Sequence, residues 1–159
     1  MRMSVLTIAT IAAVSIGALA NAEGHISDKQ IEAAMKARQS HMQLYSFHLA
    51  TLGSMAKDEI AYDTEAASAS ADSIVALTGL SQAGYWVPGS DSDSVEGSRA
   101  LPAIWADGSD IGAKAGALTD AALAVQAAAA TDLDALKAAM GPLGKACGAC
   151  HETYRLPKN

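Results

Sequence analysis

The sequence contains few aromatic residues: one Phe, two Trp and four Tyr among 159 residues. Strands favour aromatic and β-branched side chains, so this scarcity leaves little material for a sheet. Alanine, the strongest helix former, is abundant instead, and its small side chain lets helix backbones approach closely. The composition therefore predicts an all-helical protein.

The chain has no basic run longer than two residues, and its 17 Asp and Glu outnumber its 11 Lys and Arg. Residues 1–22, which are interpreted below as a signal peptide, contain one Arg and no Asp or Glu. Their removal would leave 10 Lys and Arg against 17 Asp and Glu, a net charge of −7. Nucleic-acid binding depends on clustered positive charge, so we expect no nucleic-acid partner. An acidic protein is steered electrostatically toward partners with basic docking surfaces.

The first 22 residues have the layout of a secretory signal peptide. A charged start at Arg2 precedes an apolar run over 5–19, and small residues stand at Ala20 and Ala22. The run is short for a bilayer span of ~20 residues and lacks a charged stop-transfer flank. We therefore predict cleavage after residue 22, export to the periplasm and no stable membrane insertion afterwards.

Residues 23–159 are enough for one domain, and helical spacing recurs in four of their segments. The first begins at Ser27, which forms a capping-box pattern with Gln30. The second begins at Thr64, which can cap it, and the third begins at Pro102. The fourth begins near Thr131, with Asp134 as the expected capping partner. The first helix is expected to bury one stripe, made of Ile31, Met35, Arg38, Met42, Tyr45, Leu49, Leu52 and Ala56.

Residues 82–101 are rich in Gly, Ser and Asp and predict a long loop, which the Tyr85-Trp86 pair should anchor to the domain. The first and third connections are short. Short connections favour antiparallel neighbours, so the expected fold is an up-down-up-down antiparallel four-helix bundle. Its alanine-rich faces would permit a homodimer.

The strongest motif in the chain is Cys147-Gly148-Ala149-Cys150-His151. Two cysteines at this spacing can each form a thioether with a haem vinyl group, and the following histidine can bind the iron. The motif therefore predicts one covalent haem c, with His151 as an axial ligand.

Three other interpretations of the cysteines fit less well. A dithiol redox site is expected near a helix start in a βαβ setting, whereas this pair lies late in the last helix. A structural zinc site needs more ligands than the pentapeptide supplies. A structural disulfide between Cys147 and Cys150 would close too short a loop to constrain the chain.

The second axial position decides the function, because a closed His/Met pair indicates electron transfer and an open position indicates gas binding or catalysis. An antiparallel first helix would bring Met35 or Met42 toward the haem, and spacing alone does not choose between them. His41 and His48 lie off that stripe and are expected at the surface or boundary. His25 is expected in solvent.

Two arginines share the faces that carry this chemistry. Arg38 lies on the first helix's apolar stripe, where it needs an anion such as a haem propionate or a route to solvent. Arg155 follows His151 by one helical turn and could cover the haem ring on its proximal side, the side that His151 binds.

These features resemble the class II cytochromes c, which comprise cytochrome c′ and its low-spin, methionine-ligated relatives. The resemblance rests on the pentapeptide and on the following matches: Arg38-Gln39 with Met42, Met55-Ala56-Lys57, Tyr62-Asp63, Ile104-Trp105, Leu136 to Met140, Gly144-Lys145-Ala146 and Tyr154-Arg155. It implies a four-helix bundle, Arg38 and Gln39 bordering the haem, and Met42 in the distal position. Asp58 stands where relatives often have glycine.

The resemblance is greater to the low-spin branch, which implies electron transfer with His151 and Met42 as axial ligands and no catalytic residue. The redox partners would carry basic docking surfaces. The alternative is a cytochrome c′-like five-coordinate haem that binds nitric oxide or carbon monoxide. An enzyme would need a distal acid–base group, and His41 is expected to point away.

Overall fold

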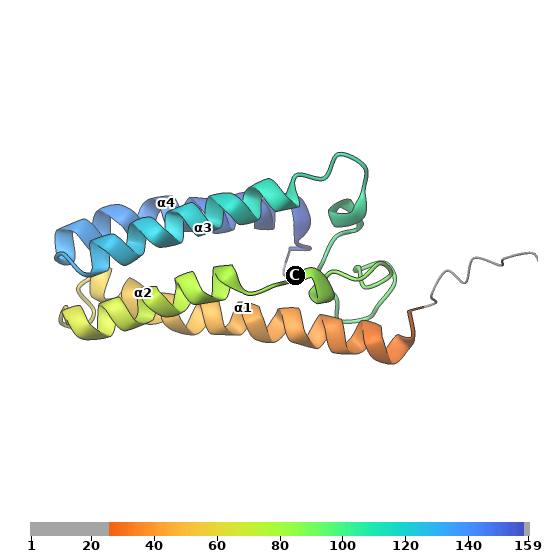
Figure 1. Cartoon of the computed structure of the whole chain (residues 1–159), viewed down its shortest axis with the longest axis horizontal. Coiled ribbons are helices and arrows are strands. Elements are labelled where there is room, and N and C mark those ends of the chain that lie inside the picture. Colours follow the sequence, from red (N-terminus) through yellow and green to blue (C-terminus); the bar gives the residue numbers. More distant parts are fainter. Residues whose placement is uncertain (1–25, 158–159) are drawn as a thin grey trace, which may run out of the picture.

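The computed structural model describes residues 26–157 and shows an all-α protein (Figure 1). The helices are α1 (Asp28–Ala56), α2 (Thr64–Gly79), α3 (Ile111–Ala129) and α4 (Leu133–Tyr154). Two 3-10 helices, η1 (Ala83–Tyr85) and η2 (Pro102–Trp105), lie between α2 and α3. The predicted signal peptide and His25 lie outside the described residues.

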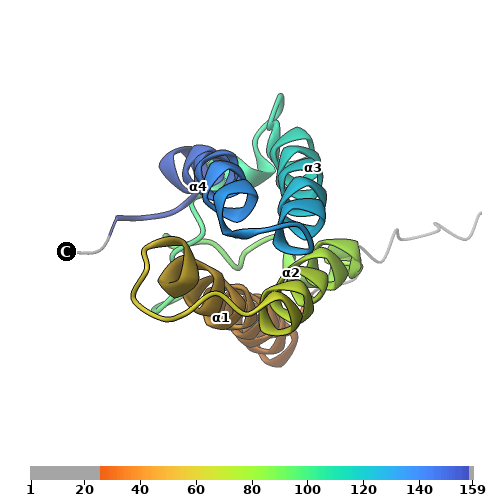
Figure 2. The ribbon, with the colours of Figure 1, turned by 90° about the vertical axis from the view of Figure 1, so that its left-hand side faces the viewer.

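Each long helix runs antiparallel to the next, and α4 also lies beside α1, which closes the bundle. Figure 2, which looks along the bundle, shows the helices in the order α1, α2, α3, α4 around a common core. That core is formed by aliphatic side chains and alanines from all four helices, including the fully buried Leu52, Ile74, Val125, Leu136 and Leu143. The predicted four-helix bundle is confirmed.

The helix starts show which capping predictions were correct. The Ser27–Gln30 capping box is present, with the Ser27 amide donating to Gln30 Oε1 at 2.9 Å. The other two predicted caps were displaced by one residue or more. Asp63 rather than Thr64 caps α2, and Asp132 rather than Thr131 or Asp134 caps α4. Each aspartate accepts a backbone N–H three residues on, at 2.8 Å, because its carboxylate is the stronger acceptor for these amides.

The buried face of α1 is rotated relative to the predicted stripe. Its buried residues are Ala34, Arg38, His41, Tyr45, Leu52 and Met55. His41 is only 3% exposed, whereas Met42 is 39% exposed. The expectation that His41 lies at the surface was therefore wrong. Hydrophobicity alone misplaced the face, because the buried His41 ring packs against the aromatic rings of Tyr45 and of Tyr85 in η1.

The third helix also begins later than predicted. Pro102 starts only the short η2, and α3 begins at Ile111. Gly108 lies between them with a φ of 81°, a left-handed conformation that ends helical continuity. Between residues 26 and 157, no helix is both long and apolar enough to span a membrane.

Candidate haem-attachment site

The motif residues lie on the last two turns of α4, at the bundle end where the 80–110 connection packs. Cys147 and Cys150 are both half-buried and form no disulfide. Burial raises the pKa of both thiols, so both are neutral at pH 7. His151 is also half-buried. The structure therefore brings two free thiols and one imidazole together on one helix.

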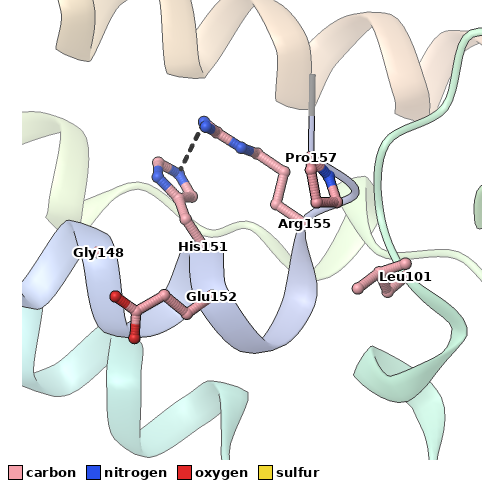
Figure 3. A pocket seen from close by; sticks show the side chains of 6 residues that line it. All are labelled: Leu101, Gly148, His151, Glu152, Arg155 and Pro157. Carbon is pink, nitrogen blue, oxygen red and sulfur yellow. Dashed lines mark hydrogen bonds between the residues drawn. The ribbon is translucent and has the colours of Figure 1, made fainter. Parts of the chain in front are cut away.

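A surface cavity of about 410 Å³ opens beside His151. It is lined by Leu101, Gly148, His151, Glu152, Arg155 and Pro157. In Figure 3 the side chains of His151 and Arg155 project from α4 toward α1, while Glu152 points the other way. An open space thus adjoins the imidazole on the side that faces the first helix.

The electrostatic surroundings keep His151 in the form that binds a metal. Burial lowers the pKa of its imidazole, and the positive charges of Arg155 and Arg99 lower it further. Arg155 Nη1 lies 3.5 Å from His151 Nε2, so this arginine lies on the same side of α4 as the imidazole, and its covering of the haem stays a prediction. A neutral imidazole has a free lone pair for coordination.

Cys150 contacts a small second cluster of apolar residues. The cluster contains Ala100, Ile104 and Tyr154, with Trp86, Trp105, Ile111 and Cys150 packed against it. Trp105 Nε1 donates to the Trp86 backbone carbonyl at 2.9 Å, which ties the Trp105 indole to the loop at Trp86. Trp86 thus anchors the long loop as predicted, but its place in the same cluster as the cysteine was not foreseen, because only the fold brings these segments together.

Cys147 lies close enough to Tyr45 of α1 for their charges to interact. Burial raises the pKa of the Tyr45 hydroxyl to about 12, with a smaller contribution from the negative charge that Cys147 can carry. Because α1 and α4 are antiparallel (Figure 1), the residue three positions before Tyr45 lies level with the residue three positions after Cys147. Met42 therefore lies at about the same height along the bundle axis as Cys150.

The two histidines of α1, His41 and His48, differ in their surroundings. His41 stacks against Tyr45 with ring centroids 4.9 Å apart, and neither its Nε2 atom nor the Tyr45 hydroxyl has a hydrogen-bond partner within the described part of the chain. The premise that His41 points off the buried face was thus incorrect. His48 is half-buried and packs edge-on against Phe47, at the boundary where it was expected.

Arg38 and Gln39, which the resemblance places at the haem border, both reach toward the long loop. Arg38 is 5% exposed, so the alternative expectation, in which its guanidinium reaches solvent, is ruled out. Its guanidinium donates to oxygen atoms of Tyr85, Ser90 and Ser98. The Gln39 amide donates to the Gly97 carbonyl at 3.3 Å. A haem-binding role for either residue stays a prediction.

The residues present fit a covalently attached haem. The two free thiols and the neutral His151 imidazole are the groups that such a haem requires. The cavity beside His151 gives access to the imidazole. Cys147 and Cys150 are also the only two cysteines in the sequence, so a haem held by two thioethers must use both of them.

Comparison with known proteins agrees with this site. The family model for cytochrome c′ matches residues 33–155. A cytochrome c-554 from Cereibacter sphaeroides is 43% identical over 127 residues, covering 80% of this chain and 83% of the relative. A cytochrome c′ from Alcaligenes xylosoxydans is 36% identical over 128 residues, covering 80% of this chain and 96% of the relative.

A solved structure supports the same relationship. The cytochrome c′ from Rhodobacter sphaeroides superposes with a TM-score of 0.78 at 34% identity, covering 80% of this chain and 98% of that one. The free thiols of Cys147 and Cys150, the adjoining imidazole and the four-helix bundle are thus found in a chain whose sequence and fold both match one family. This protein belongs to the cytochrome c′ family, the class II cytochromes c, and carries covalently attached haem c.

Proposed function

We propose that this protein is a periplasmic electron carrier in which His151 and Met42 are the two axial ligands of the haem iron. A His/Met pair closes the coordination sphere and raises the reduction potential, which suits outer-sphere electron transfer. The residues involved bind and orient the haem, and none is assigned a catalytic role.

The position of Met42 carries this proposal. The side chain is 39% exposed, so its thioether is not taken up by core packing, in contrast to Met55, which is 2% exposed. Met42 is level with Cys150, whereas Met35 lies about two turns farther along α1, or ~10 Å away along the axis. Met42 is therefore the methionine of α1 that is better placed to approach an iron held by His151.

The similarity to named relatives gives further support. The two cytochrome c-554 relatives are 43% and 42% identical to this chain, while the cytochromes c′ with comparable coverage are 35% and 36% identical. The acidic surplus of the chain favours redox partners with basic docking surfaces. Arg99 and Arg155 make the immediate surroundings of His151 more positive than the chain as a whole.

The alternative function is gas binding at a five-coordinate haem. Solved cytochrome c′ structures from Alcaligenes xylosoxidans include complexes with carbon monoxide and with nitric oxide, at 34% and 33% identity to this chain. The same exposure of Met42 is compatible with a side chain that only borders an open distal face.

Absorption spectra of the oxidised and reduced protein, with and without carbon monoxide, distinguish the two functions. Methionine ligation predicts a sharp reduced α-band, a weak far-red band in the oxidised protein and no response to the gas. A broad high-spin reduced spectrum that shifts with carbon monoxide would refute electron transfer through a His/Met haem and establish the alternative. The absence of a haem band would exclude both.

A further inference from the structure

The guanidinium of Arg38 lies at the centre of a hydrogen-bond network with the loop formed by residues 85–98. Nη1 donates to the Tyr85 carbonyl at 3.2 Å and to Ser90 Oγ at 2.7 Å. Nη2 donates to the Ser90 carbonyl at 2.5 Å and to Ser98 Oγ at 2.8 Å. Of the five N–H donors of an arginine, four are therefore used by this loop, and only Nε–H remains.

The acceptors are as deeply buried as the arginine itself. Ser90 is 0% exposed and Ser98 is 6% exposed. Each also supports the loop backbone, since Ser98 Oγ donates to the Ser90 carbonyl and Ser90 Oγ donates to the Val87 carbonyl. Burial lowers the pKa of Arg38, while nearby Asp91 acts in the opposite direction. The loop is thus built around one buried cation, whose desolvation the oxygen dipoles and Asp91 offset.

The same network reaches the haem-attachment residues through Trp86. Arg38 Cζ lies 5.4 Å from the centre of the Trp86 ring, at cation–π distance. The Trp86 carbonyl accepts the Trp105 indole N–H, and both indoles pack in the cluster that contains Cys150. Arg38 therefore contacts Trp86, Trp86 is hydrogen-bonded to Trp105, and both indoles pack against the same buried residues as Cys150.

We propose that Arg38 is a positioning residue that clamps the 85–98 loop and thereby holds Trp86 in the apolar cluster against which Cys150 also packs. Four of its five donors are used by the loop, so its main influence on the haem passes through the packing of the two indoles in this cluster. This inference rests on haem attachment at Cys150, and it is independent of whether Met42 binds the iron.

Limited proteolysis of the haem-loaded protein tests the clamp directly. Glu96 is the only glutamate in the 85–98 loop and is exposed, so cleavage by a glutamate-specific protease reports how often the loop opens. Arg38→Gln should increase cleavage at Glu96 by about tenfold or more, because it removes the shared donor of several buried acceptors. Cleavage after Glu65, in α2, is the internal reference.

Two matched variants separate the clamp from other roles. Arg38→Lys keeps the charge but lacks the planar fork, so it should restore little of the protection at Glu96. Gln39→Ala removes one exposed hydrogen bond to the same loop and should change cleavage less than about twofold. Tryptophan fluorescence, which comes from Trp86 and Trp105 and is quenched by a nearby haem, should rise in Arg38→Gln and remain low in Gln39→Ala.

The contrary result is equally specific. If Arg38→Gln leaves cleavage at Glu96 and the fluorescence unchanged but alters the pH dependence of the reduction potential, Arg38 acts on a propionate and the clamp is refuted. If Arg38→Gln does not fold, the double variant Ser90→Ala and Ser98→Ala loosens the clamp from the other side, because it removes two of the four acceptors and keeps Arg38 with the two backbone carbonyls. Protection of Glu96 in that double variant would also overturn the proposal.

Discussion

The Tyr154 hydroxyl donates a hydrogen bond to Asp110 Oδ1 at 2.5 Å and joins the last turn of α4 to the first turn of α3. The same hydroxyl accepts from the Asp110 amide at 2.9 Å and from Ser109 Oγ at 3.2 Å. Tyr154 is 5% exposed and lies one turn beyond His151. This pair therefore fixes the end of the helix that carries the motif.

The hydrogen bond predicts how stability depends on pH. The Tyr154 hydroxyl lowers the pKa of Asp110, and Lys114 lowers it further. A carboxyl with a depressed folded-state pKa stabilises the protein above its ordinary pKa of about 3.9, and this stabilisation is lost as the pH falls through the folded-state value. Tyr154→Phe should therefore destabilise the protein more at pH 7 than at pH ~3, as measured by denaturant unfolding.

Tyr62 provides the control for this prediction. Its hydroxyl donates to the Ala129 carbonyl at 2.8 Å, an acceptor that does not titrate. Tyr62→Phe should lower the free energy of unfolding by a similar amount at both pH values. An equal loss at both pH values for Tyr154→Phe would show that Asp110 does not contribute through its charge.

Met42→Ala tests the second axial ligand. If Met42 binds the iron, the change should lower the reduction potential by on the order of 0.1 V and give a high-spin or water-bound haem. Met35→Ala, about two turns earlier on the same helix, should leave the spectrum unchanged. A Met42→Ala protein with the wild-type spectrum would show that this thioether is not a ligand.

Leu52→Ala should create a cavity in the bundle core. Leu52 is 0% exposed and belongs to the main cluster, so the free energy of unfolding should fall by ~2–5 kcal/mol. Leu123→Ala removes the same atoms at a site that is 46% exposed and should cost less than ~0.5 kcal/mol. If the two variants lost similar free energies of unfolding, as measured in urea, this result would contradict the core described above.

The turn after α1 allows a test of backbone strain. Asp58 has a φ of 59°, in the left-handed region, and its carboxylate pairs with Lys137 Nζ at 2.8 Å. Asp58→Val should destabilise the protein by ~1–2 kcal/mol, because a β-branched residue is strained at this φ. Asp58→Asn tolerates the conformation and loses only an exposed ion pair, so its cost should stay below ~1 kcal/mol.

The sequence alone determined the helical fold and the position of the chemistry. Alanine content, helical spacing and two short connections were enough to predict the bundle, because these signals are local along the chain. The pentapeptide likewise identified Cys147, Cys150 and His151, since its spacing on one helix does not depend on the rest of the fold. The αL conformation of Asp58 is one that glycine adopts without strain, which agrees with the glycine that the family resemblance implies at this position.

Only the tertiary structure decided which face of α1 is buried and what the long loop does. Arg38 and His41 are polar, so hydrophobic spacing could not predict that both lie inside. They are buried because Ser90, Ser98, Tyr85 and α2 provide oxygen acceptors and aromatic faces from distant parts of the chain. The same packing leaves the apolar Met42 partly exposed and brings Trp86 and Cys150 into one apolar cluster. These relationships depend on contacts between separate segments, and such contacts exist only once the bundle has formed.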